Sequence, residues 1–282
     1  ATFVDGTLTI TKAPLSVTAD AKSKVYGVAN PALTATLTGF VNGETLATSG
    51  VTGAASVTTS ATAATSVGNA TLTATFGTLA AANYSFGTFV DGTLTITKAM
   101  LTVTADAASR GYGVANPALT ATFTGFVNGE TLATSGIAGA TALTTTATTA
   151  SPVFTYAITP ALGTLSAANY AFTFVDGILT IAKATLTVTA DAQTKVYGAA
   201  NPTLTATLTG FINGETLATS DVTGTPAVTT AASAITGVGS ATLSAAMGTL
   251  ASTNYAFNFV NGTLTMLVAE RNNFLAAVYP TG

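Results

Sequence analysis

Three glutamates have the side-chain type that could support acid–base chemistry. Glu44, Glu130 and Glu215 each follow an Asn-Gly pair, one in each of three similar segments. Glycosidase-type catalysis needs two carboxylates that face a bound sugar, one of them with a raised pKa, and each segment offers a single glutamate. A carboxylate directly after a tight turn commonly accepts hydrogen bonds from local backbone N–H groups. We therefore expect these glutamates to be structural and predict no catalytic residue.

The composition excludes most other chemistry. The 282 residues include no His, Cys or Trp, so imidazole bases, thiolate nucleophiles and the usual zinc, haem and iron–sulfur ligands are missing. The net charge of −3 argues against nucleic acid, because phosphate binding needs clustered Lys and Arg. No apolar run reaches the roughly 18 residues of a membrane helix. We expect no enzyme, no cofactor, no nucleic-acid partner and no membrane insertion.

Metal sites are equally disfavoured by the carboxylates that remain. Asp20, Asp106 and Asp191 end the first predicted strand of each segment, where capping of a turn is the usual function of an aspartate. No structural or catalytic metal is predicted.

A recurring loop is the second candidate site. The pattern Tyr-Gly-x-x-Asn-Pro occurs three times, at spacings of 86 and 85 residues, which indicates three copies of one unit. Its tyrosines and asparagines, with the three glutamates, are the candidate ligand positions: Tyr26, Asn30, Glu44, Tyr112, Asn116, Glu130, Tyr197, Asn201 and Glu215. Three copies of such a loop would bind a glycan or a host or matrix protein with multivalent avidity.

The elements that must position these residues are predicted to be strands. Segments such as LTVTADA at Leu101 and LTATFTG at Leu119 alternate apolar residues with Thr, a period of two that is typical of half-buried strands. About seven short strands fit into one unit. That number buries its apolar faces best as two packed antiparallel sheets. The predicted fold class is all-β, with three tandem Ig-like antiparallel β-sandwiches arranged as a rod.

Turn residues support this strand pattern. Asn42-Gly43 and its two counterparts suit a tight turn with positive φ, and we expect a second turn of this kind at Asp91-Gly92 and its counterparts. Tyr84, Tyr170 and Tyr255 precede the last predicted strand pair. Each is a candidate tyrosine corner, in which the hydroxyl bonds nearby backbone.

The order LTVTADA, YGVANPALTAT, GFVNGE, ANY, FVDGTLTI resembles the MBG domain, a mostly bacterial Ig-like repeat of large surface and secreted adhesin-like proteins. The resemblance covers Ala1 to about Val268. It implies an extracellular or cell-surface structural function and brings no catalytic residue and no agreed ligand site. Repeat two departs from the pattern at Arg110-Gly111, where the other repeats have Lys24-Val25 and Lys195-Val196.

The repeats divide the chain into predicted domains. These are repeat 1 (13–98), repeat 2 (99–183), repeat 3 (184–268) and a non-repeat tail (269–282). Residues 1–12 resemble the last strand of a repeat whose other strands are missing. We interpret them as the terminal strand of a preceding domain. The alternative is a strand that pairs with a neighbouring subunit through Phe3, Val4, Leu8 and Ile10.

The junctions between repeats are very short. Only Lys98-Ala99-Met100 and Lys183-Ala184-Thr185 separate the last predicted strand of one repeat from the first strand of the next. Strands of 10 to 12 residues at roughly 3.3 Å each predict three repeats of about 110 Å in total. We expect a stiff rod without calcium, because the junctions offer lysine in place of clustered carboxylates. An intramolecular bond from Lys12, Lys98 or Lys183 to an asparagine is a minor alternative.

These observations predict a non-enzymatic segment of a bacterial adhesin stalk or extracellular fibre, with self-assembly through β-strand addition as a further expectation. Its expected partners are further copies of the same domain, in the same or neighbouring chains. The alternative is a set of adhesin repeats that bind a glycan or an extracellular matrix protein.

Overall fold

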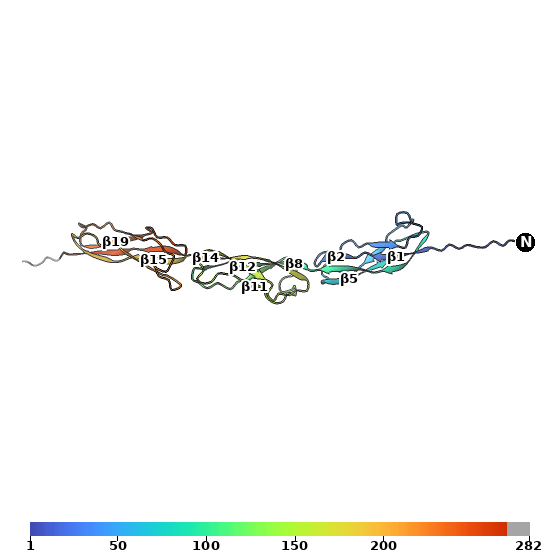
Figure 1. Ribbon diagram of the computed structural model, residues 1–282, viewed down its shortest axis with the longest axis horizontal. Helices are drawn as coiled ribbons and strands as arrows, with labels where there is room; N and C mark the ends of the chain where they lie inside the picture. The colour runs from blue at the N-terminus through green and yellow to red at the C-terminus, as the bar shows by residue number, and fades with distance from the viewer. Residues whose placement is uncertain (270–282) are drawn as a thin grey trace, which may run out of the picture. The chain divides into compact units, whose positions relative to one another are not determined.

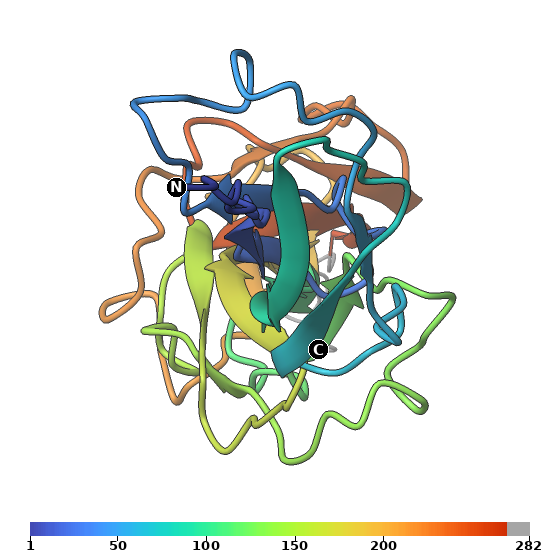
Figure 2. The same ribbon diagram turned by 90° about the vertical axis from the view of Figure 1, so that its right-hand side faces the viewer.

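A computed structural model describes residues 1–269 of this chain. Within that range the regular elements are all strands, joined by loops and turns, with no helix (Figures 1 and 2). By its contacts the chain divides into two compact units. The first comprises residues 1–105, 121–143 and 160–175, and the second comprises 106–120, 144–159 and the chain from Asp176 on. Each unit therefore contains one junction between repeats. The predicted tail from residue 270 on lies outside the described residues.

Each repeat contributes seven strands to the described part of the chain. Repeat 1 has β1(Ala13–Ala19), β2(Lys22–Val25), β3(Ala35–Thr38), β4(Ser56–Thr58), β5(Gly68–Thr75), β6(Tyr84–Val90) and β7(Gly92–Thr97). Repeat 2 has β8(Ala99–Ala105), β9(Ala108–Gly111), β10(Ala121–Thr124), β11(Ala142–Thr144), β12(Thr155–Ala161), β13(Tyr170–Val175) and β14(Gly177–Ala182). Repeat 3 has β15(Ala184–Ala190), β16(Gln193–Val196), β17(Ala206–Thr209), β18(Ala227–Thr229), β19(Gly239–Ala246), β20(Tyr255–Val260) and β21(Gly262–Leu267).

The strands form two sheets in every repeat. In repeat 1 the orders are β3-β1-β6 and β2-β7-β5-β4, and the other repeats have the corresponding orders. The prediction of purely antiparallel sheets is wrong, because β1 pairs with β6 in parallel and β2 pairs with β7 in parallel. Each of the three repeats thus consists of two sheets that contain both parallel and antiparallel strand pairs.

The parallel pairs arise because two neighbouring segments change sheets together. β1 leads into β2 across Asp20 and Ala21, and β6 leads into β7 across Asp91. Both segments run in the same direction, so their pairing is parallel before and after the crossing. At the crossing, a Cβ on Gly92 would overlap the backbone carbonyl of Ala19. Glycine is therefore required at this position because of close backbone approach.

This geometry corrects one turn prediction and confirms the other. Gly92, Gly177 and Gly262 begin strands, and neither they nor Gly6 adopt the positive φ expected of a tight turn. Asn42 and Gly43, in contrast, have φ values of 57° and 72°, and the N–H of Glu44 donates to the carbonyl of Val41 at 3.0 Å. The Asn-Gly pairs thus form tight turns, as predicted.

In repeat 1 the core lies between the two sheets. In repeat 1, Val17 from the three-stranded sheet and Leu72, Leu94 and Ile96 from the four-stranded sheet are buried in one cluster. The threonines between them on β7 are exposed, which confirms the alternation read from the sequence. The same cluster includes Tyr170 of repeat 2. Within the first unit, the hydrophobic core thus continues across the junction.

Candidate functional site

A tyrosine at the start of β6, β13 and β20 anchors one end of each repeat. Tyr84, Tyr170 and Tyr255 are each 1% exposed. Each hydroxyl accepts a hydrogen bond at 3.2 Å from the backbone N–H of a residue just before an Asn-Gly turn: Val41, Val127 and Ile212 respectively. The predicted bond between these hydroxyls and backbone is confirmed, with the hydroxyl as acceptor.

The same hydroxyl donates to the glutamate that follows the turn. Tyr84 donates to Oε2 of Glu44 at 2.5 Å, and Tyr255 donates to Oε2 of Glu215 at 2.6 Å. Tyr170 donates to Oε2 of Glu130. The expectation that these carboxylates accept hydrogen bonds from local backbone N–H groups is wrong. Each glutamate side chain points inward and accepts from a tyrosine 40 residues away, because that tyrosine is buried beside it.

The second carboxylate oxygen binds a tyrosine of the preceding repeat. In the first unit, Tyr26 donates to Oε1 of Glu130 at 2.5 Å. In the second unit, Tyr112 donates to Oε1 of Glu215 at 2.5 Å. Glu130 and Glu215 therefore each hold two tyrosine hydroxyls, one from their own repeat and one from the repeat before it.

Packing around the carboxylate completes this contact. The rings of Tyr26 and Tyr170 meet edge to face with centroids 5.7 Å apart, and those of Tyr112 and Tyr255 do so at 5.6 Å. Such pairs contribute about 0.5–1.5 kcal/mol beyond area burial. We call each set of Tyr, Glu and Tyr a junction cluster: Tyr26, Glu130 and Tyr170 in the first unit, and Tyr112, Glu215 and Tyr255 in the second.

The glycine of each Tyr-Gly pair lies against an apolar side chain of the next repeat. A Cβ on Gly27 would overlap Val127, and a Cβ on Gly113 would overlap Ile212. Glycine at these positions thus permits close approach as well as the positive φ of 84° and 78°. Val127 and Ile212 were not predicted as contact residues. An apolar residue directly before every Asn-Gly pair could have indicated a buried contact at this position.

Two asparagines add a further bond at each junction. Oδ1 of Asn169 accepts from the N–H of Val67 at 3.0 Å, and Oδ1 of Asn254 accepts from the N–H of Val153 at 2.9 Å. These asparagines directly precede the anchoring tyrosines. Neither asparagine stood out among the predicted site residues.

The junction environment disfavours ionised tyrosine. The hydrogen bond to Glu130, together with burial, raises the pKa of Tyr26. Burial and the hydrogen bond to Glu215 raise the pKa of Tyr112, and raise the pKa of Tyr255 to about 12. A phenolate beside a carboxylate would place two negative charges together. The clusters are therefore suited to holding neutral tyrosine hydroxyls.

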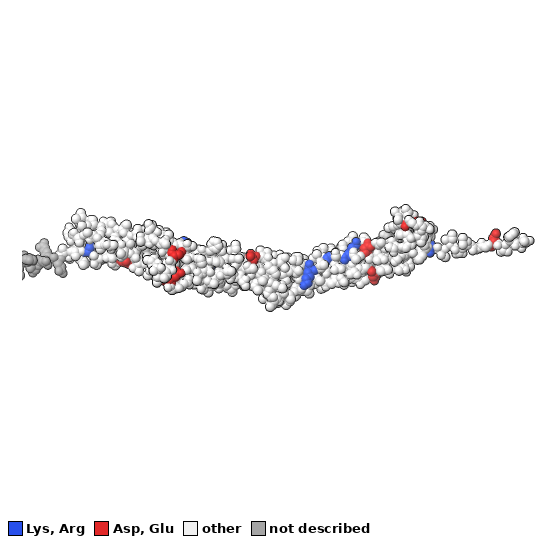
Figure 3. Space-filling model, in the orientation of Figure 1, with Lys and Arg blue, Asp and Glu red and all other residues white. Residues whose placement is uncertain are grey.

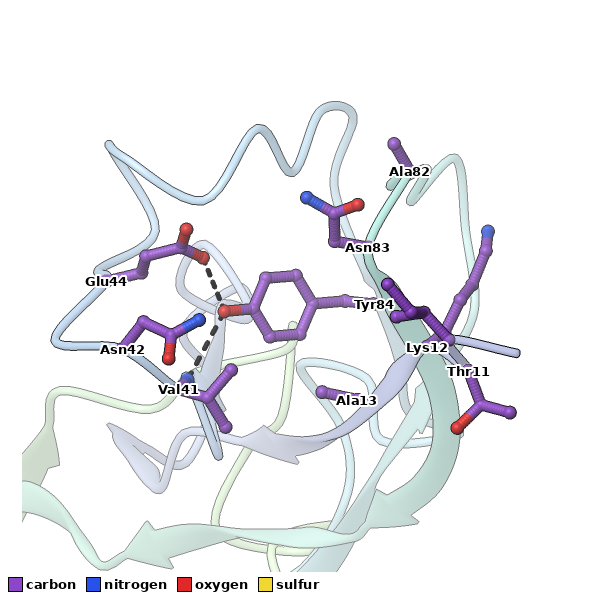
Figure 4. A pocket seen from close by; sticks show the side chains of 10 residues that line it. Thr11, Lys12, Ala13, Val41, Asn42, Glu44, Ala82, Asn83 and Tyr84 are labelled. Carbon is purple, nitrogen blue, oxygen red and sulfur yellow. Dashed lines mark hydrogen bonds between the residues drawn. The ribbon is translucent and has the colours of Figure 1, made fainter. Parts of the chain in front are cut away.

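Within residues 1–269, repeats 1 and 3 each carry one part of a junction cluster without its partner. Repeat 1 has the glutamate and its buried tyrosine, and repeat 3 has the tyrosine of the Tyr-Gly pair. Glu44 binds Tyr84 through Oε2, and within the described residues no group contacts its Oε1 through a hydrogen bond (Figure 4). Tyr197 is 48% exposed, whereas Tyr26 is 3% and Tyr112 is 5% exposed. Of the predicted ligand positions, four are therefore inside junction clusters: Tyr26, Glu130, Tyr112 and Glu215. Among the described residues, Glu44 and Tyr197 are the predicted glutamate and tyrosine that belong to no junction cluster.

The asparagines predicted to bind a ligand instead hold the loop together. Nδ2 of Asn30, Asn116 and Asn201 donates to a backbone carbonyl 31 residues further along the chain. A buried cation lies beside each of them. Nζ of Lys195 donates to Oδ1 of Asn201 at 2.9 Å and to the carbonyl of Ser233 at 2.5 Å. Lys24 and Arg110 occupy the corresponding positions and also bond loop carbonyls.

The remaining charged residues are arranged as local scaffolding. Asp20 accepts hydrogen bonds from Thr34 and Thr36, and Asp191 from Thr205 and Thr207; these bonds lower the pKa of both aspartates. Exposed Lys12, Lys98 and Lys183 donate to backbone carbonyls, a geometry that argues against a covalent bond to asparagine. Among residues 1–269 no group of three or more carboxylates forms a cation site. Charged side chains are sparse on the face that Figure 3 shows.

The predicted intersubunit strand pairs with no sheet of the described residues. Residues 1–12 form no strand, and Phe3, Val4, Leu8 and Ile10 are all exposed. Figure 1 shows this segment leaving β1 as an extended trace.

Comparison with known families gives one result. A family model described as MBG domain (YGX type) matches residues 15–95, 101–180 and 186–265. No curated protein matches this chain. In the part of the chain that the structure describes, no helix has the length and apolar character needed to cross a membrane.

Proposed function

This chain belongs to the MBG domain family of the YGX type, and we propose that it is a non-enzymatic structural segment of a bacterial adhesin stalk or extracellular fibre. Its three tandem repeats are modules of the surface-protein or adhesin-like kind. The proposed location is extracellular or at the cell surface, and the proposed function is to provide length and stiffness.

The observation that carries this proposal is the sharing of one carboxylate by two repeats. In each unit, a glutamate accepts hydrogen bonds from a tyrosine of its own repeat and a tyrosine of the preceding one. Hydrogen bonds to charged groups contribute about 1.5–3 kcal/mol each. Together with the single-residue linkers Lys98 and Lys183, these bonds favour a fixed angle between neighbouring repeats. A spacer that transmits force needs such junctions, and a set of independent binding modules does not.

We further propose that each repeat is an Ig-like sandwich and that the three together form a rod. Small-angle X-ray scattering of the purified chain tests the second statement. A maximum dimension on the order of 110 Å for the three repeats, from a strand rise of roughly 3.3 Å per residue, supports a rod. A much shorter dimension, or a scattering curve typical of freely jointed domains, contradicts it.

Ligand binding is the second candidate. Two features favour it within the described residues: the exposed side chain of Tyr197, and Oε1 of the half-buried Glu44, which has no hydrogen-bond partner. A glycan or matrix protein bound there would contact repeat 3 or repeat 1 only. Binding to glycan and matrix-protein arrays, lost in Tyr197→Ala or Glu44→Ala, would support this function. Binding that persists in both variants would exclude these two positions.

A further inference from the structure

The end of repeat 1 that carries Glu44 has an open pocket. The pocket has a volume of about 250 Å³ and is lined by Ile10–Ala13, Val41, Asn42, Glu44, Ala82, Asn83 and Tyr84 (Figure 4). We propose that this pocket and residues 3–12 together form a docking surface for one further YGX-type MBG repeat that lacks its own last strand. This deepens the proposed function, and it rests on the idea that MBG repeats stack end to end.

The internal junctions identify what fits the pocket. Glu130, Tyr170 and Val127 are the counterparts, 86 residues further on, of pocket residues Glu44, Tyr84 and Val41. In repeat 2 the corresponding place is taken by Tyr26, which bonds Glu130 and stacks edge to face on Tyr170. The pocket at Glu44 is therefore a tyrosine socket of the same composition. Its uncovered wall includes Val41, which is 45% exposed.

The chemistry of the socket selects a Tyr-Gly turn. Oε1 of Glu44 is an acceptor for one more hydroxyl, and Oδ1 of Asn83 corresponds to the Asn169 oxygen that binds a backbone N–H of the preceding repeat. Val127 lies where any Cβ on Gly27 would overlap it. By the same geometry, the residue of the docked repeat that packs against Val41 has to be glycine.

Residues 2–12 identify the rest of the partner. Their sequence, TFVDGTLTITK, is identical to residues 88–98. In that second copy Leu94 and Ile96 are 0% and 2% exposed, because β7 lies between β2 and β5. Leu8 and Ile10, the matching residues, are 86% and 87% exposed. The segment therefore carries the side-chain pattern of a last strand without the sheet that buries it.

One partner satisfies both requirements at once. In repeat 1 the backbone N–H of Tyr26 donates to the carbonyl of Thr97 at 2.9 Å, so the Tyr-Gly turn is attached to the end of the last strand. Thr11 is the counterpart of Thr97. A repeat that takes residues 6–11, the counterparts of β7, between its second and fifth strands consequently places its Tyr-Gly turn at the Glu44 socket. Strand addition provides the backbone bonds, and the socket fixes the register.

Repeat 3 of the same chain provides an acceptor for the test. It has an uncovered Tyr197-Gly198 turn, but β21 already occupies the position of the last strand. A chain that ends after Val260 lacks β21 and presents the open sheet. We expect this truncated chain to form head-to-tail polymers in sedimentation velocity experiments, and the full chain to remain monomeric.

Matched variants of the truncated chain separate specific donation from aggregation. Leu8→Asp places a charge on the face that β7 buries and should reduce the polymer to monomer. Thr9→Asp changes the face that is exposed on β7 and should leave the polymer unchanged. Glu44→Gln should accelerate dissociation several-fold, whereas Glu215→Gln, which changes an internal junction, should not. Polymers of the truncated chain that persist in Leu8→Asp would overturn the proposal. Polymers of the full chain would also overturn it, because they would show that a repeat with its own last strand binds the docking surface.

A second variant keeps the test decisive if the truncated repeat 3 does not fold. In it, a copy of residues 13–87 is joined to Thr2 of the full chain, so that residues 2–12 complete a fourth repeat. Amide hydrogen exchange should then slow at residues 4–11 to the level of residues 90–97, and should also slow at the Val41–Glu44 turn. Unchanged exchange at the turn would show that the socket is not the docking surface. Either failure would leave the spacer function intact, since that function depends on the two internal junctions.

Discussion

At the scale of single residues, the three glutamates differ in the number of tyrosines that they hold. Glu130 accepts from Tyr26 and Tyr170, whereas within residues 1–269 Glu44 accepts a hydrogen bond from Tyr84 only. A glutamine has one acceptor oxygen and one donor group at its end. It can therefore serve one tyrosine hydroxyl well but not two.

We accordingly expect Glu130→Gln to lower the free energy of unfolding by about 1.5 to 3 kcal/mol, the range for a hydrogen bond to a charged group. Glu44→Gln is the matched control and should have a smaller effect, because its amide can rotate to present oxygen to Tyr84. Urea unfolding followed by circular dichroism measures both. Equal effects of the two substitutions would contradict the shared-carboxylate account.

The raised tyrosine pKa values predict a loss of stability at high pH. Burial and the bond to Glu215 raise the pKa of Tyr255 from 10.0 to about 12. A group whose pKa is higher in the folded state contributes stability that is complete below its unfolded pKa and is lost as pH rises through the folded value. Stability should therefore fall between about pH 10 and about pH 12.

Tyrosinate absorbance and urea unfolding at several pH values in this window measure the effect. Glu215→Gln should lower the pKa of Tyr255, because it removes the neighbouring negative charge, and should shift its titration to lower pH. A titration that is identical in the two proteins would show that Glu215 does not contact this hydroxyl.

At the scale of elements, each repeat uses one buried cation to hold two loops. Lys195 is 6% exposed, and its Nζ bonds the carbonyls of Ser233 and Ala199 and the side chain of Asn201. Lys195→Met would leave these acceptors unpaired, at a cost of about 1–3 kcal/mol. Lys195→Arg should be tolerated better, since Arg110 occupies this position in repeat 2.

Thermal unfolding of these variants tests the loop account. Lys183→Met is the matched control, because Lys183 also donates to one carbonyl, that of Ser252, but is exposed. Its effect should be small. A destabilisation as large as that of Lys195→Met would show that the burial of the cation has no special consequence.

The strand crossing at Gly92 gives a second prediction for elements. Gly92→Ala would push a Cβ into the backbone carbonyl of Ala19, and overpacking of this kind typically costs about 1–3 kcal/mol. Gly87→Ala, in the neighbouring strand β6, is the control because nothing lies within 4 Å of its Cβ. Chemical denaturation should show a lower midpoint for Gly92→Ala only. A similar midpoint for both would contradict the close approach.

The strands and the Asn-Gly turns could be predicted from the sequence because both depend on local patterns. Alternation of apolar residues with Thr places Leu94 and Ile96 in the core, and only a few residue types tolerate the positive φ of Asn42. The prediction for Asp91-Gly92 was wrong because this glycine is required by a close contact and not by a tight turn. The contact is with the backbone of Ala19, which is 73 residues away in the sequence. The partner of Glu130 was likewise beyond local reasoning, since Tyr26 is 104 residues away and belongs to another repeat.

At the scale of the whole molecule, the account depends on whether the junction clusters hold neighbouring repeats at a fixed angle. The chain has no cysteine, so spin labels can be placed at two introduced cysteines without background. Thr73 of repeat 1 and Thr124 of repeat 2 are exposed strand residues of the first unit. They report on the junction that contains Tyr26 and Glu130.

Pulsed electron double resonance measures the distribution of distances between the two labels, and its width reports how freely the two repeats move. The account predicts a single narrow distribution in the otherwise unchanged chain and a clearly broader one after Tyr26→Ala with Glu130→Ala. A distribution that is already broad in the unchanged chain, or that stays narrow in the double variant, would contradict the account.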